Sequence, residues 1–257
     1  MDDLDTLAAE IADADTVAAL TGAGISAPSG VPTFRGEGGV WEHFDEGQFT
    51  YGRFQRDPAG FWRDRVELYE AMFGDDFEPN AGHGALADLA ADGHLEAVLT
   101  QNTDGLHAEA ADGITDEDRP ELLELHGNAR RVRCVDCGRR EENGPILKRV
   151  RSGDVPPRCS CGGIFKPDVV LFGEQLPGGA LQRARTLARE SDVFLAIGSS
   201  LVVQPAASLP RQAAQTGGTL AIVNLEETPY DTDASALFRA DVTDVLPRLR
   251  DAVRERA

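Results

Sequence analysis

Short apolar runs recur along this chain, and most of them end in glycine or in a polar residue. These runs occupy residues 16–20, 95–99, 169–172, 193–197 and 220–223. Helical patterns separate several of them, as at residues 81–91 and 180–189, and another helical pattern covers residues 2–13. Strands that alternate with helices form a parallel sheet, and ligands bind at the carboxyl ends of its strands. The sequence therefore predicts an α/β fold with a ligand site where polar residues follow the strands.

Two segments interrupt this alternation and predict a second, smaller lobe. The first, approximately residues 37–79, is rich in aromatic residues and indicates a loop followed by helices. The second, approximately residues 130–165, contains all the cysteines and has little apolar periodicity. The other segments form the predicted large lobe of a single domain over residues 1–257, at approximately residues 1–36, 80–129 and 166–257.

The four cysteines form the pattern Cys134-x-x-Cys137 followed by Cys159-x-Cys161. Thiolates are the usual ligands of tetrahedral zinc, and a site with four protein ligands keeps no open position for catalysis. The pattern therefore predicts one structural zinc, which holds together a lobe with little core of its own. The alternative is four free thiols.

A glycine-containing loop follows the first apolar run. Residues 22–27 fit the Gly-x-Gly-x-x-Gly/Ala pattern, in which glycines let the backbone approach a pyrophosphate. A tight strand-to-helix turn explains this motif nearly as well. The next residues, 29–36, are too rich in glycine and proline for a phosphate-binding helix and indicate a loop that brings Arg35 to a cofactor. No acidic residue ends a second strand ~20 residues later, as an ordinary hydride-transfer domain would require.

Six motifs, in order, resemble those of the sirtuin family and together cover nearly the whole chain. They lie at residues 22–35, 100–107, 125–127, 172–174, 198–205 and 223–224. In turn they resemble the family's cofactor loop, its Gln-Asn-Ile-Asp block, its catalytic histidine, its acyl-peptide clamp and its two adenosine-side motifs. The resemblance implies a Rossmann-like parallel sheet domain with an inserted zinc ribbon and a helical small lobe.

The resemblance also implies the function of an NAD-dependent protein-lysine deacetylase. The acyl-lysine carbonyl oxygen attacks the NAD ribose, nicotinamide leaves, and O-acetyl-ADP-ribose forms. The implied catalytic residues are His126 and Asn102, and a histidine pKa of about 6.5 suits proton transfer around neutrality. The implied NAD-binding residues are Gly22, Ala23, Gly24, Ser26, Phe34, Arg35, Gln101, Asn102, Asp104, Gly198, Ser199, Ser200, Asn224, Leu225 and Glu226. The implied acyl-peptide residues are Val170, Phe172, Gly173 and Glu174.

Other functions stay open on the same fold. They are mono-ADP-ribosyl transfer, removal of succinyl or malonyl groups, and a nucleotide-sensing or chromatin-interaction module with little turnover. Family members that remove succinyl or malonyl groups carry Tyr-x-x-Arg in the helical lobe, and these positions fall on Arg65 and Leu68. Leu68 predicts a preference for acetyl-lysine, unless Arg65 points inward. Two departures from the family's usual residues, Thr33 and Thr103, lie at the implied nicotinamide side.

The charge balance indicates the salt conditions to which the protein is adapted and the kinds of partner it can bind. Acidic residues number 44 against 25 basic ones, for a net charge of −19, and Lys148 and Lys166 are the only lysines. Either this is a solvated acidic surface, or the protein is adapted to molar salt, and the scarcity of lysine favours an extremely halophilic source. The acidity argues against direct nucleic-acid binding. We expect acyl-lysine proteins as substrates, either a chromatin protein or a metabolic enzyme.

Location is predicted from two features of the sequence. It contains no apolar run of the ~18 residues that a membrane helix needs. Its first residues are acidic, which is the wrong charge for a secretory signal. We therefore expect a cytoplasmic protein without membrane contact.

Overall fold

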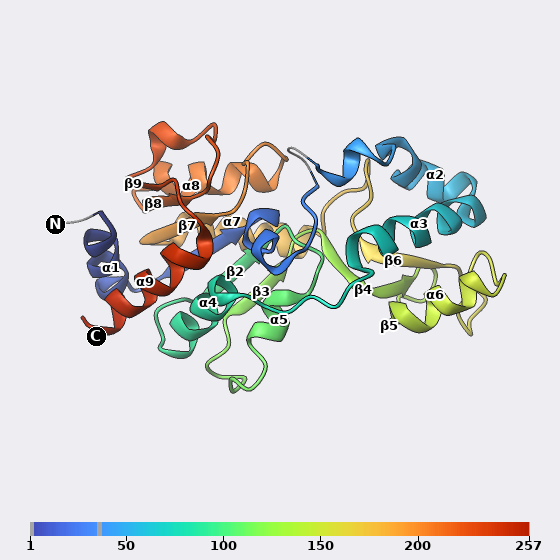
Figure 1. Cartoon of the computed structure of the whole chain (residues 1–257), viewed down its shortest axis with the longest axis horizontal. Helices are drawn as coiled ribbons and strands as arrows, with labels where there is room; N and C mark the ends of the chain where they lie inside the picture. Colours follow the sequence, from blue (N-terminus) through green and yellow to red (C-terminus); the bar gives the residue numbers. More distant parts are fainter. Residues whose placement is uncertain (1–2, 35–37, 257) are drawn as a thin grey trace.

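The computed structural model describes residues 3–34 and 38–256, and these form a large and a small lobe (Figure 1). Six parallel strands build the large lobe, in the order β3-β2-β1-β7-β8-β9. They are β1 (Val17–Thr21), β2 (Ala97–Thr100), β3 (Glu121–Glu124), β7 (Val193–Ile197), β8 (Thr219–Val223) and β9 (Ala236–Phe238). The predicted parallel sheet is therefore confirmed, and the sequence located all its strands except β3 and β9.

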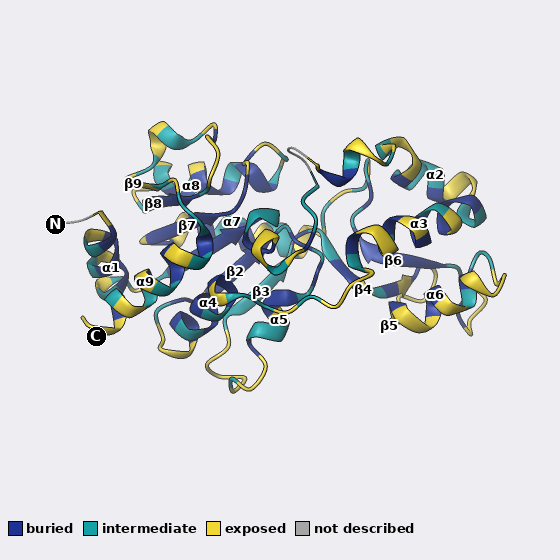
Figure 2. Ribbon diagram, viewed as in Figure 1, coloured by how far each residue is buried: buried dark blue, intermediate teal, exposed yellow. Residues whose placement is uncertain are grey.

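Helices cover both faces of this sheet. One face packs against α1 (Asp3–Asp13), α4 (Ala81–Ala91) and α9 (Val242–Arg254). The other packs against α7 (Gly178–Glu190) and α8 (Leu209–Gln215). Alternate residues of a strand point to opposite faces, so Val17 joins the first core and Ala18 the second. The central strands β1, β2, β7 and β8 are therefore buried almost throughout (Figure 2), which favours continuously apolar sequences.

The direction of strand order reverses at β1, which pairs with β2 on one side and with β7 on the other. A crevice forms outside the carboxyl ends of the strands at such a switch point. The loop after β1 and the loop after β7 meet there. The short helix α5 (Leu106–Ala110) follows the loop after β2 on the same edge.

The small lobe contains a three-stranded antiparallel sheet, in the order β5-β4-β6, and three helices. The strands are β4 (Gly127–Cys134), β5 (Arg140–Glu142) and β6 (Phe165–Val169), and the helices are α2 (Tyr51–Arg56), α3 (Pro58–Phe73) and α6 (Asn143–Arg151). The apolar run at residues 169–172 begins where β6 ends, so its assignment to the parallel sheet was wrong. Its Val169 and Leu171 are buried in the small lobe instead, and periodicity alone does not distinguish these two kinds of burial.

The small lobe has a substantial hydrophobic core, which corrects the prediction that zinc holds together a lobe with little core of its own. Phe61 and Trp62 of α3 pack in one cluster with Val132 and Phe165 of the small sheet. The indole Nε1 of Trp62 donates to the Phe165 carbonyl over 2.8 Å. The aromatic segment and the cysteine segment, both predicted to form the smaller lobe, complete one hydrophobic core together.

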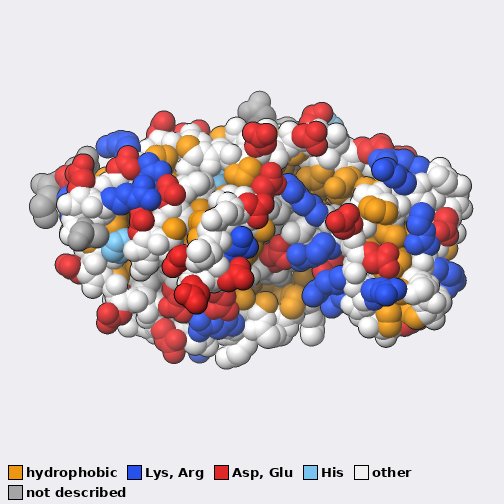
Figure 3. Space-filling view, turned by 90° about the horizontal axis from the view of Figure 1, so that it is seen from below, with side chains coloured by type: hydrophobic (Ala, Val, Ile, Leu, Met, Phe, Trp, Pro, Cys, Tyr) orange, Lys and Arg blue, Asp and Glu red, His pale blue; other side chains and the backbone are white. Residues whose placement is uncertain are grey.

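Charged side chains of both signs are interspersed over both lobes on the face drawn in Figure 3. The ion pairs are made mainly by arginines, such as Arg254 Nε to Asp92 Oδ2 at 2.5 Å. Such half-exposed pairs contribute about 0–1 kcal/mol each. None of the helices in the described ranges combines the length and apolar character needed to cross a membrane.

Candidate active site

A cavity of about 840 Å³ lies between the lobes, within the size range of ligand sites. Its lining comes from both lobes and includes most of the predicted cofactor-binding, catalytic and acyl-peptide residues. Among its lining are Gly22, Ala23, Gly24, Phe34, Gln101, Asn102, His126, Val170, Phe172, Gly173, Glu174, Gly198, Ser199, Ser200, Asn224, Leu225 and Glu226. The predicted Ser26 and Asp104 are buried beside this lining, and Arg35 lies outside the described residues. Thr33 and Thr103 also face the cavity.

Three glycines let the loops after β1 and β7 touch at the switch point. The Gly24 N–H donates to the Gly198 carbonyl over 2.8 Å. A Cβ atom at Gly24 would lie 2.7 Å from the Gly198 Cα, and one at Gly22 would lie 2.8 Å from the Gly198 oxygen. Gly198 itself has a φ of +58°, which is left-handed. The close contact between the two loops therefore requires glycine at these positions. The same three glycines line the cavity, and backbone without side chains is what a pyrophosphate site requires.

Asn102 is held by the loop after β1. Its Nδ2 donates to the Ser26 hydroxyl over 3.0 Å and to the Gly22 carbonyl over 3.1 Å. Ser26 in turn donates to the Asp104 carboxylate over 2.8 Å. Burial raises the pKa of Asp104. Because both amide hydrogens of Asn102 are used within the protein, its side-chain oxygen is the group left for a ligand.

His126 lies immediately before β4, where the chain passes into the small lobe. Its Nδ1 is 3.0 Å from the Gln101 carbonyl oxygen. A carbonyl only accepts, so Nδ1 carries the hydrogen and Nε2 keeps a free lone pair. Burial lowers the pKa of His126, which favours this neutral form. The ring is therefore prepared to accept a proton from a group in the cavity.

Two further histidines, His83 and His107, are buried behind Asn102. No signal in the sequence indicated that these two residues lie together. His83 Nδ1 accepts from the Asn80 N–H at the start of α4, so its Nε2 donates toward Ser26 over 3.3 Å. His107 Nε2 lies 2.9 Å from the Thr21 hydroxyl. Burial lowers the pKa of His83 to about 4 and that of His107 to about 3. Both are therefore neutral near pH 7.

The predicted acyl-peptide segment closes on itself through Glu174. The Glu174 Oε2 accepts from the Lys166 Nζ over 2.9 Å and from the Leu171 N–H over 3.0 Å. The Phe172 ring packs edge-on against Trp41, with centroids 5.3 Å apart. Val170 N–H donates to the His126 carbonyl over 2.9 Å, so this segment runs directly beside the histidine.

Arg65 of α3 also lines the cavity, next to Leu68. It is 7% exposed, and its Nε is buried without a hydrogen-bond partner. Burial lowers the pKa of Arg65 to about 10, so the guanidinium stays charged near neutrality. The sequence left its direction open, because only the packing of α3 decides which way the side chain points.

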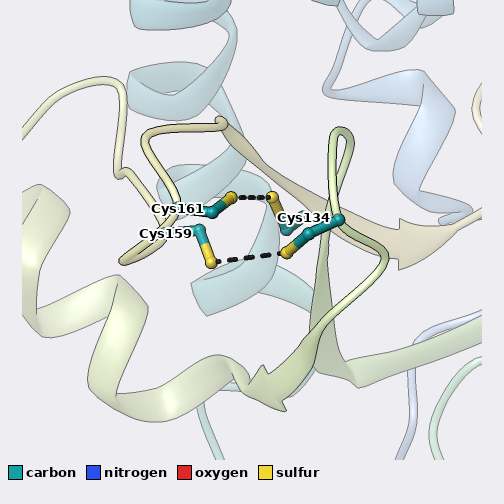
Figure 4. A group of neighbouring side chains, drawn as sticks. Cys134, Cys159 and Cys161 are labelled. Atoms are coloured by element: carbon teal, nitrogen blue, oxygen red, sulfur yellow. Dashed lines mark hydrogen bonds between the residues drawn. The ribbon is translucent and has the colours of Figure 1, made fainter.

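The four cysteine sulfurs meet at one point of the small lobe (Figure 4), all within 4.8 Å of one another. Cys134 and Cys161 sulfurs are 3.5 Å apart, and Cys137 and Cys159 sulfurs are 3.8 Å apart. Sulfurs bound to one tetrahedral zinc at ~2.3 Å lie about 3.8 Å from each other, so the geometry fits zinc. A hydrogen bond from the Cys161 N–H lowers the pKa of Cys159 to about 7, which favours the thiolate.

Comparisons with known proteins agree with this geometry. The Sir2 family profile matches residues 22–205. An NAD-dependent protein deacetylase of the halophile Haloarcula marismortui is 55% identical over 248 residues, covering 96% of this chain and 93% of the relative. One from Sulfolobus acidocaldarius is 44% identical over 231 residues, covering 90% and 87%. A solved Sir2 complex with a p53 peptide and NAD⁺ superposes with a TM-score of 0.83 at 36% identity, covering 96% of both chains. This chain belongs to the Sir2 family.

Proposed function

We propose that this protein is an NAD-dependent protein deacetylase, which transfers the acetyl group of a lysine to ADP-ribose and releases nicotinamide. The observation that carries the proposal is the free Nε2 of His126, set beside a glycine-lined crevice and a peptide-side segment in one cavity. Two comparisons support the proposed function. The relatives are named NAD-dependent protein deacetylases, and one solved Sir2 complex holds a deacetylated peptide and 3′-O-acetyl ADP-ribose.

The residues around the crevice fit NAD. Backbone without side chains at Gly22, Gly24 and Gly198 admits a pyrophosphate, and Asn224 to Glu226 border the same cavity. The side-chain oxygen of Asn102 is directed to the nicotinamide half, where Ser26 and Asp104 fix its orientation. Bound NAD supplies the ribose that accepts the acyl group.

His126 is the proposed general base. Its Nε2 takes a proton from a ribose hydroxyl, directly or by relay, while the Nδ1–H stays on the Gln101 carbonyl. Val170, Phe172 and Gly173 hold the acyl-lysine segment, and Glu174 acts by keeping this turn closed. Zinc on Cys134, Cys137, Cys159 and Cys161 is structural in this proposal, because four protein ligands complete its tetrahedron.

The expected substrates are acyl-lysine proteins, and a chromatin protein or a metabolic enzyme fits equally. We also propose a cytoplasmic location, which is supported by four unpaired thiols gathered for a metal.

The test is incubation with NAD⁺ and an acetyl-lysine peptide at high salt, with products identified by mass. We expect nicotinamide, free lysine peptide and O-acetyl-ADP-ribose in equal amounts. Replacement His126→Ala should lower turnover ~10²–10⁴-fold while NAD⁺ still binds. The exposed His43→Ala is the matched control and should behave as wild type. ADP-ribosyl-peptide as the main product would instead support mono-ADP-ribosyl transfer.

A further inference from the structure

A second cavity, of about 180 Å³, lies in the large lobe and is bordered by the two buried histidines. None of the described residues lines both this cavity and the larger one between the lobes. Its walls come from α4, β2, α5, β3 and the segment just before β3. Most of these walls are apolar and include Leu86, Ala87, Val98, Ala111 and Leu122. Asp112 and Arg119 are exposed and also line the cavity, so it opens to solvent beside them.

His107 presents a polar atom to this cavity. Its Nε2 lies 2.9 Å from the Thr21 hydroxyl, and this hydroxyl donates to the Thr100 hydroxyl over 2.9 Å. A hydroxyl has a single hydrogen, so Nε2 must donate to Thr21 and the lone pair of the ring lies on Nδ1. The described residues give this Nδ1 no hydrogen bond, although His107 is only 8% exposed. His83 beside it differs, because both of its ring nitrogens have partners.

The size and the walls of the cavity restrict what it can hold. An apolar cavity of about 150 Å³ binds benzene, so this one has room for a single ring of that size. An unpaired acceptor in apolar surroundings is costly, and a ligand that donates one hydrogen bond removes that cost. Burial lowers the pKa of His107 to about 3, so its ring is neutral near pH 7 and offers an anion no charge to pair with. The cavity therefore fits a neutral molecule.

We propose that this cavity is a binding site for a small neutral aromatic molecule that carries one O–H or N–H donor, with phenol as the simplest example. The aromatic ring lies among Leu86, Val98 and Leu122, and its donor bonds to the Nδ1 of His107. The inference does not rest on the proposed deacetylase function, because no residue of this site is assigned to NAD or to acyl-lysine. The site is nevertheless close to the active site, since Thr100 Oγ1 also accepts from the Asn102 N–H over 3.0 Å.

The test compares phenol with toluene, which has nearly the same shape but carries a methyl group in place of the hydroxyl. We expect phenol to bind saturably and at least ~10-fold more tightly than toluene, because toluene leaves the Nδ1 lone pair buried without a donor. The nitrogen NMR signal of His107 Nδ1, identified by its absence in His107→Gln, should shift with phenol and not with toluene. Excess ADP-ribose, added to occupy the larger cavity, should leave the affinity for phenol unchanged.

A filled cavity provides the matched pair of variants. Ala87→Leu extends a side chain from α4 into the cavity and should abolish phenol binding, while His107 is kept. Ala91→Leu makes the same change at an exposed position of α4 that does not line the cavity, and it should bind phenol as the wild type does.

Four results would each overturn the inference: no saturable phenol binding, equal affinity for phenol and toluene, displacement of phenol by ADP-ribose, or unchanged phenol binding in Ala87→Leu. If Ala87→Leu does not fold, the His107 nitrogen signal of the wild type decides. A shift with phenol alone supports the site, and the lack of any shift contradicts it. None of these measurements involves turnover, so their outcome is separate from that of the deacetylase assay.

Discussion

The Nδ1 of His126 lies 3.0 Å from the carbonyl oxygen of Gln101, in the loop directly after β2. This contact settles which ring nitrogen carries the hydrogen in the neutral form, because a carbonyl cannot donate. Gln101 is fixed in turn by its side chain, whose Nε2 donates to the Ser199 hydroxyl after β7 over 2.8 Å. The orientation of the proposed base thus depends on two neighbouring loops of the switch point.

The pH dependence of the reaction follows from the buried position of His126. Burial lowers its pKa below the usual value of about 6.5, and the hydrogen bond to Gln101 offsets only part of this shift. A base must be neutral, so activity is lost as pH falls through the lowered pKa and is retained above it. We expect the acidic limb of kcat/KM to have a pKa below 6.5. A limb centred at pH 7 or higher would contradict the assignment.

Acid stability reports on the buried His107. Its pKa is about 3 in the fold and about 6.5 in the unfolded chain, so below pH 6.5 the unfolded state binds more protons. The stabilisation is present above pH 6.5 and is lost as pH falls toward 3. His107→Gln keeps a donor for Thr21 but does not titrate, so it should flatten the fall in unfolding free energy between pH 6.5 and 5. Exposed His43→Gln is the control, and equal slopes in both variants would sink the idea.

Zinc content can be measured by metal analysis, and the effect of zinc removal on the small lobe can be measured by tryptophan fluorescence. Metal analysis should find about one zinc per chain. Both tryptophans of the chain, Trp41 and Trp62, lie in the small lobe, so their fluorescence reports on this lobe. Chelation should shift the emission and abolish activity, while the shared aromatic core keeps part of the lobe collapsed. Full activity in metal-free protein would argue against the structural role.

Salt should stabilise the fold. The net charge of −19 makes carboxylate repulsion the main surface effect, and salt screens it. Salt also weakens the arginine ion pairs, but these contribute only about 0–1 kcal/mol each. We expect the melting temperature to rise from low salt to molar potassium chloride. A flat or falling melting temperature would remove the inference of salt adaptation.

The sequence predicted the central strands well because burial on both faces makes them uniformly apolar. The sequence did not predict β3, because this edge strand is only half-buried and begins and ends with glutamate, at Glu121 and Glu124. It therefore lacks the continuous apolar run of the central strands. The cysteine site was readable from spacing, since ligands close in sequence need little tertiary information. The inward direction of Arg65 and the joint core around Trp62 depend on how distant segments pack, and local patterns do not encode that.

The bond between Trp62 and the Phe165 carbonyl spans 103 residues of chain, and this distance has a consequence for biosynthesis. Ribosomes extend chains at about 5–20 residues per second, so the indole of a nascent molecule waits on the order of 5–20 seconds for its acceptor. During that interval the aromatic segment is made but its core is incomplete. The exposed rings are then a natural target for chaperones, and the small lobe closes only after the second cysteine pair has left the ribosome.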